Sequence, residues 1–333
     1  MKQNISPEQA MKQVRKIFRQ RGTKALETAR REILKEKIEC KETREALNYF
    51  ITKYWHDVTR PSLLSLACAA VGGNPEITTP VAVSMILTSG AMDIHDDLID
   101  ESRKKESRDT VLGKYGKTIA LLVGDALMFK GLVLLQRALE NGVSAENRAR
   151  ILDVVERRFF ELGDAEAMEL SLQARTDITP KEYLYIVKKK AADMEAYMRI
   201  GGILGGGTHE EIEALGKYGR ILGTLIILRD DLIDMIDLHE TVQRIRKESL
   251  PLPILYALQD TAQREALVGL IHQKKHTISR AKKVIELAGS SGGMKQTRGL
   301  MQRLIDHACN LMNNIEYERP NLKLLLYAMI SFE

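Results

Sequence analysis

The chain has 333 residues, enough to bury a sizeable core, and its charged residues nearly balance to a formal net charge of +5. Acidic and basic residues are interleaved, so this modest basic excess excludes a nucleic-acid-binding reading. The three cysteines, Cys40, Cys68 and Cys309, lack C-x-x-C spacing, which excludes a disulfide framework and a zinc site and favours the cytoplasm. No run of about 18 uninterrupted apolar residues occurs, and we predict no transmembrane span.

Composition predicts an all-α fold, because proline is scarce (8 residues) and good helix formers dominate. A polar stretch at residues 101–116 predicts a loop, which at about 15 residues is long enough to be functional. No strand pattern or linker divides the chain, so we expect one helical bundle domain over residues 1–333. Expected helices cover residues 6–37, 41–55, 61–73, 81–100, 117–141, 145–175, 180–205, 208–236, 250–288, 294–315 and 319–332.

The sequence DDLID occurs twice, at Asp96–Asp100 and Asp230–Asp234. In a helix, the carboxylates at i and i+4 lie on one face with the i+1 carboxylate beside them. Each copy follows an apolar run, so neither reads as an ordinary solvated face. Two such clusters predict a shared cationic ligand.

Magnesium suits these clusters, because it prefers oxygen ligands and is commonly held by one or two carboxylates together with substrate phosphates. Neutralising a leaving diphosphate would make ionisation of an allylic C–O bond feasible, and an apolar cavity would protect the carbocation. If the motif occurred only once, the alternative would be an acidic helix end with a purely structural role. A di-iron site would need E-x-x-H pairs, and the chain has none.

With these motifs the chain resembles the trans-isoprenyl diphosphate synthases, or polyprenyl synthetases, from about Tyr54 to Leu258. The resemblance implies an all-α isoprenoid synthase fold around a deep central cavity, a homodimer, and two or three Mg2+ ions shared with the substrate diphosphate. The matching segments are HDDLID at 95–100, TVLGKYG at 110–116, GDALM at 124–128, KEYLYIVKKKAA at 181–192, YGRILG at 218–223, RDDLIDMID at 229–237 and LPLPILYAL at 250–258.

Family position also implies the site residues. The two catalytic, metal-binding motifs would be Asp96, Asp97 and Asp100, and Asp230, Asp231 and Asp234. The cations that bind diphosphate would be Arg60, Lys105, Lys190 and Lys247, the last aligned across a loop shorter than the family's.

Departures from the family pattern concentrate on the acceptor side. The lysine that would hold isopentenyl diphosphate is Asp57, the second arginine after the first motif is Glu106, and an expected histidine is Ser89. Two carboxylates in place of two cations would cost several kcal/mol for a bound diphosphate within about 4 Å. On the allylic side, Ala191 and the pair Ile226–Ile227 are the milder changes.

Three readings follow. In the first, the protein is a prenyltransferase that couples an allylic prenyl diphosphate to another prenyl diphosphate or to a neutral acceptor. In the second it is a terpene synthase, in which the substrate's own double bond is the nucleophile. In the third it is a non-catalytic subunit of a heteromeric synthase. Retention of both motifs argues against the third, and the overall resemblance favours the first.

The prenyl tail should lie against the residues one turn before Asp96. Ala91 and Met92, with Gly90, are expected to line this tail pocket, and none is aromatic. A tail of C15 or longer would then fit. The alternative is that these small residues serve only close helix packing.

Overall fold

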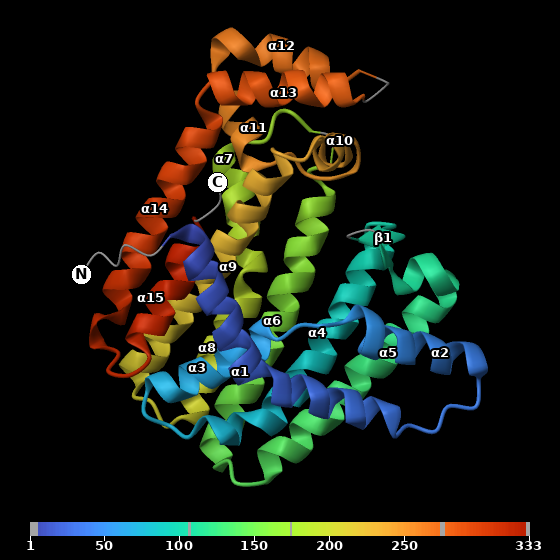
Figure 1. Ribbon diagram of the computed structural model, residues 1–333, viewed down its shortest axis with the longest axis vertical. Coiled ribbons are helices and arrows are strands. Elements are labelled where there is room, and N and C mark those ends of the chain that lie inside the picture. The colour runs from blue at the N-terminus through green and yellow to red at the C-terminus, as the bar shows by residue number, and fades with distance from the viewer. Residues whose placement is uncertain (1–5, 106–107, 174, 274–276, 331–333) are drawn as a thin grey trace. The chain divides into compact units, whose positions relative to one another are not determined.

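The computed structural model describes residues 6–105, 108–173, 175–273 and 277–330, and most of them lie in helices (Figure 1). The α-helices are α1 (Pro7–Leu34), α2 (Lys41–Tyr49), α3 (Thr59–Ala70), α4 (Thr79–Ile99), α5 (Val111–Glu140), α6 (Ala145–Leu170), α7 (Pro180–Lys190), α8 (Ala192–Leu204), α9 (His209–Asp234), α10 (Leu238–Lys247), α11 (Leu252–Ala257), α12 (Thr261–Ile271), α13 (Ile278–Ser290), α14 (Gly293–Leu311) and α15 (Arg319–Ala328). Shorter elements are the π-helix η1 (Phe50–Tyr54), the 3-10 helices η2 (Pro75–Thr78) and η3 (Met312–Asn314), and the antiparallel strands β1 (Lys104–Lys105) and β2 (Arg108–Asp109).

The chain falls into two compact units. The N-terminal unit is formed by Gln13–Leu152 with Ile200–His209, and the C-terminal unit by the rest of the described chain. Each unit contains one DDLID motif. The single domain expected over residues 1–333 stays a prediction.

In the N-terminal unit, α4 is the central helix and packs against α3 and α5 (Figure 1). Residues 81–91 of α4 are all buried because neighbouring helices cover them, as shown by fully buried Ile86. The Ser84 hydroxyl donates a hydrogen bond to the Gly131 carbonyl at 2.8 Å, which satisfies a buried polar group and ties α4 to α5. The first motif therefore emerges from a tightly held helix.

In the C-terminal unit, α9 is largely buried and ends in the second motif. The hydroxyl of fully buried Tyr218 donates to the Leu322 carbonyl at 2.8 Å and joins α9 to α15. The short helix α11 packs on α13 and α14. The second motif thus also closes a helix whose position is set by the core.

Several helix boundaries differ from the sequence-based expectation. A short first segment of α5 begins at Val111 inside the expected loop, because the Thr110 hydroxyl accepts the Gly113 amide at 3.0 Å and caps it. Gly116, at φ +79°, separates this segment from the long part of α5, which follows where the sequence predicts a helix from residue 117. Helix α10 occupies a stretch read as a break, with the Asp237 carboxylate accepting two amides of its first turn. The expected helix at 180–205 is interrupted at Ala191, and that at 250–288 is three helices. These two helices were expected to be continuous because the turns that interrupt them have weak sequence signals.

Two helical segments are long and apolar enough to cross a membrane by length and composition. The first is Pro75–Ile99, and 72% of its most apolar stretch is buried inside the protein. The second is Val111–Glu140, of which 33% is buried. The expectation of no transmembrane span stays a prediction.

We predict that Gly201→Ala destabilises the protein by about 1–3 kcal/mol, because overpacking a tight contact forces helices apart. A Cβ at Gly201 of α8 would lie 2.3 Å from the Leu64 carbonyl oxygen of α3. Thermal denaturation should show a lower midpoint. Gly163→Ala in α6, where a Cβ meets nothing within 4 Å, is the matched control and should gain about 0.5–1 kcal/mol. Equal effects of the two substitutions would contradict the close helix contact.

Candidate active site

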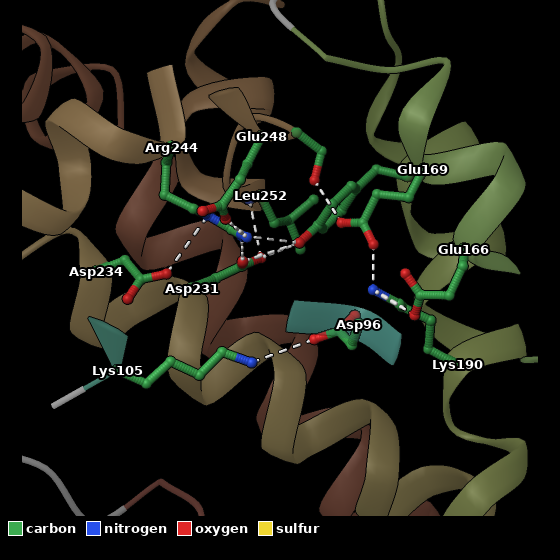
Figure 2. A network of polar contacts seen from close by, with 12 residues as sticks. Asp96, Lys105, Glu166, Glu169, Lys190, Asp231, Asp234, Arg244, Glu248 and Leu252 are labelled. Carbon is green, nitrogen blue, oxygen red and sulfur yellow. Dashed lines mark hydrogen bonds and ion pairs between the residues drawn. The ribbon is translucent and has the colours of Figure 1, made fainter. Parts of the chain in front are cut away.

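The first motif lies at the end of α4, with Asp100 at the C-cap. Its carboxylates meet a cation from the β1–β2 hairpin, since Lys105 Nζ lies 3.3 Å from Asp96 Oδ2 (Figure 2). The same ammonium lies 2.8 Å from Asp97 Oδ1. Asp97 is buried, whereas Asp96 and Lys105 are partly exposed. Burial alone would lower the pKa of Lys105, but Asp96 and Asp97 outweigh it and raise that pKa. The lysine predicted to bind diphosphate therefore sits on the predicted metal ligands.

The hairpin that carries Lys105 is short. Lys105 pairs with Arg108, and Lys104 with Asp109. Glu106, predicted to reverse a charge on the acceptor side, lies outside the described residues.

His95 packs against α5 next to the GDALM segment. Its Nε2 lies 3.3 Å from Asp125 Oδ1, and a Cβ at Gly124 would come within 2.5 Å of the same nitrogen. Glycine at position 124 therefore leaves room for the imidazole. This contact places Gly124 and Asp125 of α5 beside the residue that precedes the first motif.

Asp57 and Arg60 form an ion pair at the start of α3, with Arg60 Nη1 at 2.9 Å from Asp57 Oδ2. The other oxygen of Asp57 accepts the Thr59 amide at 2.8 Å. The Arg60 guanidinium also lies 5.9 Å from the ring centroid of Trp55. The carboxylate that departs from the family pattern thus neutralises the arginine predicted to bind diphosphate.

Asp93 was missed by the sequence analysis. It lies four residues before Asp97 on α4 and is half-buried. Burial raises the pKa of Asp93 to about 7, against the opposing effects of Arg60 and Lys105 and with reinforcement from Asp96. The available signal was the spacing D-x-x-D-D-x-x-D at 93–100, which places a further carboxylate one turn before the motif.

In the second motif, Asp231 is fully enclosed by donors from three other helices (Figure 2). The Tyr183 hydroxyl of α7 lies 2.8 and 2.9 Å from its two oxygens, and the Leu252 amide of α11 donates at 3.0 Å. The Arg244 guanidinium of α10 completes the set. These donors occupy most of the lone pairs of the carboxylate. Asp231 therefore holds the local structure together.

Asp230 and Asp234 are the more exposed carboxylates of this motif. Burial raises the pKa of Asp234 to about 7, with Asp231 and Asp230 adding to the rise and Arg244 opposing it. Burial likewise raises the pKa of Asp230 to about 6. Arg244 Nε lies 3.4 Å from Asp234 Oδ2. Both carboxylates would gain from a cation that compensates their charge.

Lys190 ends α7 and is held by carboxylates of α6 (Figure 2). Its Nζ lies 3.0 Å from Glu166 Oε1 and also contacts Glu169. The Ser249 hydroxyl donates to Glu169 at 2.7 Å. Lys190 is thus in the same unit as the second motif, and its ammonium is fixed by an ion-pair network.

Lys247 is the last residue of α10, and its side chain lies outside the described part of the chain. Arg244, one turn earlier on the same helix, was missed because the segment was read as a break. Its position three residues before Lys247 was the available signal.

The donor set fits magnesium only in combination with a phosphate ligand. Within the described residues, no three His, Cys, Asp or Glu side chains converge closely enough to hold a metal ion by themselves. Magnesium does not require such a cage, because one or two carboxylates, waters and substrate phosphates suffice. Partly exposed Asp96, Asp230 and Asp234 supply hard oxygen ligands of this kind.

The residues predicted to line a tail pocket lie in the buried part of α4. Ala91 is fully buried and Met92 is half-buried. At neighbouring Gly90, a Cβ would lie 2.9 Å from Phe50 Cε1 and 3.6 Å from Trp55 Cε2. Aromatic rings from a different segment therefore cover the α4 face on which Gly90 lies, although α4 itself presents small residues there.

Comparisons with known proteins place this all-helical chain among the isoprenyl synthases. A family model described as polyprenyl synthetase matches residues 41–288. The crystal structure of geranylgeranyl pyrophosphate synthetase from Pyrococcus horikoshii covers 96% of this chain and 99% of its own, with a TM-score of 0.85 and 24% identity. The chain belongs to the polyprenyl synthetase family, and the predicted family and all-α isoprenoid synthase fold are confirmed.

Two sequence relatives support the same family. The geranylgeranyl diphosphate synthase of Methanosarcina mazei is 32% identical over 192 residues, 57% of this chain and 58% of that protein. The short chain isoprenyl diphosphate synthase of Methanothermobacter thermautotrophicus is 31% identical over 220 residues, 64% of this chain and 66% of that protein. The chain thus matches less than two thirds of the length of either relative.

We predict that Asp234→Asn stabilises the metal-free protein. Folding raises the pKa of Asp234 from 3.8 to about 7, so the ionised carboxylate opposes folding increasingly as pH rises from about 4 to about 7, and the penalty then levels off. Urea unfolding without magnesium should show a gain of about 1–2 kcal/mol at pH 8 that shrinks toward pH 5. Asp306→Asn, an exposed position of the same unit, should show no such pH dependence. A gain independent of pH would contradict the electrostatic explanation.

Proposed function

We propose that this chain is a Mg2+-dependent class I prenyltransferase of isoprenoid biosynthesis, which ionises an allylic prenyl diphosphate of C15 or longer through its two Asp-rich motifs. The observation that carries this proposal is that each motif already has a resident cation. Lys105 contacts Asp96 and Asp97, and Arg244 contacts Asp231 and Asp234. Clustered carboxylates whose charge is already compensated by cations are suited to binding a metal diphosphate.

Two or three magnesium ions, when bound with the diphosphate, would supply charge neutralisation of the leaving group. Asp96, Asp97 and Asp100, and Asp230 and Asp234, would hold them, while Asp231 positions the second motif through its three neighbouring helices. Lys105 lies within reach to transfer from carboxylate to phosphate oxygens as metal replaces it. Arg60, Lys190 and Lys247 would bind the diphosphate further.

The step itself breaks the bond between C1 and the bridging oxygen. The electron pair leaves with the diphosphate, whose negative charge the cations stabilise, and C1 becomes an allylic cation. Ala91 and Met92 would lie along the prenyl tail. An acceptor then supplies the electron pair for the new bond, and the proton that it loses goes to the departed diphosphate. Fixed cations contribute most if they stabilise the departing diphosphate more than the bound substrate.

We favour transfer to a second substrate over cyclisation, because the relatives are named as diphosphate synthases. The altered acceptor motif, with Asp57 paired to Arg60, supports an acceptor other than ordinary isopentenyl diphosphate. A terpene synthase remains the alternative on the same fold. A non-catalytic subunit would have no need for carboxylate clusters with resident counter-ions. Free Cys40, Cys68 and Cys309 suit the reducing cytoplasm that we propose as the location.

The activity is tested with C10 to C25 allylic diphosphates and Mg2+, alone and with isopentenyl or dimethylallyl diphosphate. We expect release of diphosphate from the wild type, reduced at least about 100-fold in Asp96→Ala and about tenfold in Lys105→Ala. Chelation of magnesium should abolish it. Exposed Asp153→Ala is the control for loss of one carboxylate. A hydrocarbon product from a single substrate would indicate a terpene synthase, whereas prenyl alcohol, formed when water captures the cation, fits a transferase without its acceptor. No diphosphate release under any condition would contradict the proposal.

A homodimer is also proposed, and the exposed face of α5 supports it. Five large, exposed apolar side chains fall within an arc of about 120° around the axis of this helix. They form a patch, which isolated exposed apolar residues would not. They are Leu121, Leu122, Phe129, Leu132 and Val133. A second copy of the chain could bury them.

We predict that Phe129→Glu weakens this dimer, because Phe129 is 69% exposed in the single chain and a buried glutamate would lack a partner. Light scattering after size exclusion should give the dimer mass for the wild type and a monomer for the variant at low micromolar concentration. Ile278→Glu, which changes an exposed apolar residue at the start of α13, should leave the dimer intact. A wild type that is monomeric would refute this part of the proposal.

A further inference from the structure

The surroundings of Asp93 are predominantly acidic. Arg60 and Lys105 are the cations that act most strongly on it, and Asp96 and Asp57 are the carboxylates. Arg60 is already paired with Asp57, and Lys105 with Asp96 and Asp97. With Asp93 included, four carboxylates stand against two cations. The local charge therefore disfavours a further anion.

Asp93 lies on the α4 face that runs toward the first motif. Gly90, Asp93 and Asp97 are spaced i, i+3 and i+7 and share that face. Trp55 approaches the same face, because its Cε2 would lie 3.6 Å from a Cβ at Gly90. Trp55 also stacks on Phe50, with ring centroids 5.4 Å apart. Trp55, one of the residues that replace the family's acceptor motif, thus lies against the same face of α4 as Asp93, one turn away.

The indole N–H of Trp55 adds a second observation. Trp55 is only 6% exposed, and among the residues that the structure describes its Nε1 has no hydrogen-bond partner. A buried donor without a partner costs free energy unless a ligand or water accepts its hydrogen. Nε1 is bonded to Cε2, the ring carbon that faces α4. A neutral oxygen could accept this hydrogen bond without bringing in negative charge.

We infer that Asp93 is a specificity-determining residue that excludes diphosphate-bearing acceptors, so that the acceptor of this protein is an uncharged molecule. The inference rests on the proposed function, since it concerns the second substrate of the same site. Asp93 would be a second such carboxylate besides Asp57, and the family resemblance did not identify its position. A carboxylate about 5 Å from a bound diphosphate repels it even at the effective dielectric of a partly solvated site.

The test is the equilibrium binding of radiolabelled isopentenyl diphosphate to the full chain with Mg2+ at about pH 8.5, where Asp93, whose pKa burial raises to about 7, is ionised. We expect weak binding by the wild type and binding at least about tenfold tighter by Asp93→Asn, which removes the charge and keeps the shape. Asp93→Glu keeps the charge and should bind as weakly as the wild type. Asp57→Asn combined with Asp93→Asn should bind more tightly than Asp93→Asn alone.

Glu76→Gln is the matched control, because it removes one exposed carboxylate from the same unit. An equal gain in this control, or tight binding by the wild type, would overturn the inference. Circular dichroism confirms that each variant is folded, and Asp93→Ser provides a second neutral variant. In parallel, diphosphate release by the wild-type protein is measured with an allylic substrate alone. Its absence would count against the proposed function, whereas the binding comparison would still decide the role of Asp93.

Discussion

Repulsion among clustered carboxylates is the main physical constraint on this structure, because each motif needs a nearby positive charge. Each DDLID segment closes a helix whose apolar turns are buried, so its backbone is held in place and its carboxylates stay close together. Lys105 compensates the first cluster, and Arg244 the second. Both cations come from short elements that follow the motif in the chain. The metal-free protein is thus held by internal ion pairs at the positions where we propose that metal and diphosphate bind.

The two motifs meet this constraint in different ways. Asp97 depends mainly on one partly exposed lysine from a two-residue strand. Asp231 is instead bonded by Tyr183, Arg244 and the Leu252 amide, so that one carboxylate joins α7, α10 and α11 to α9. Loss of Asp231 would leave buried donors unpaired, which makes it a structural residue as well as a member of the motif. Equal spacing in sequence therefore conceals unequal roles.

In the function that we propose, charge would also distinguish the two substrates. Cations assigned to the allylic diphosphate remain, with Lys190 held in place by Glu166 and Glu169. Near Arg60, Asp57 and Asp93 reverse the local balance. Such an arrangement gives specificity through repulsion of the wrong ligand as much as attraction of the right one. An enzyme can then keep the ionisation step while changing what receives the carbocation.

The sequence by itself determined the fold class and the family, because helix propensity, the duplicated DDLID and the ordered family motifs are local signals. It also identified six carboxylates and four cations as candidates, whose roles stay predictions. Tertiary structure alone decided which charges are paired. Asp93 escaped notice because a single aspartate on an apolar helix has no meaning until Arg60 and Trp55 are packed nearby. Arg244 escaped because α10 begins with a cap that sequence spacing does not reveal. Partners from distant segments are set by packing, and no local pattern encodes them.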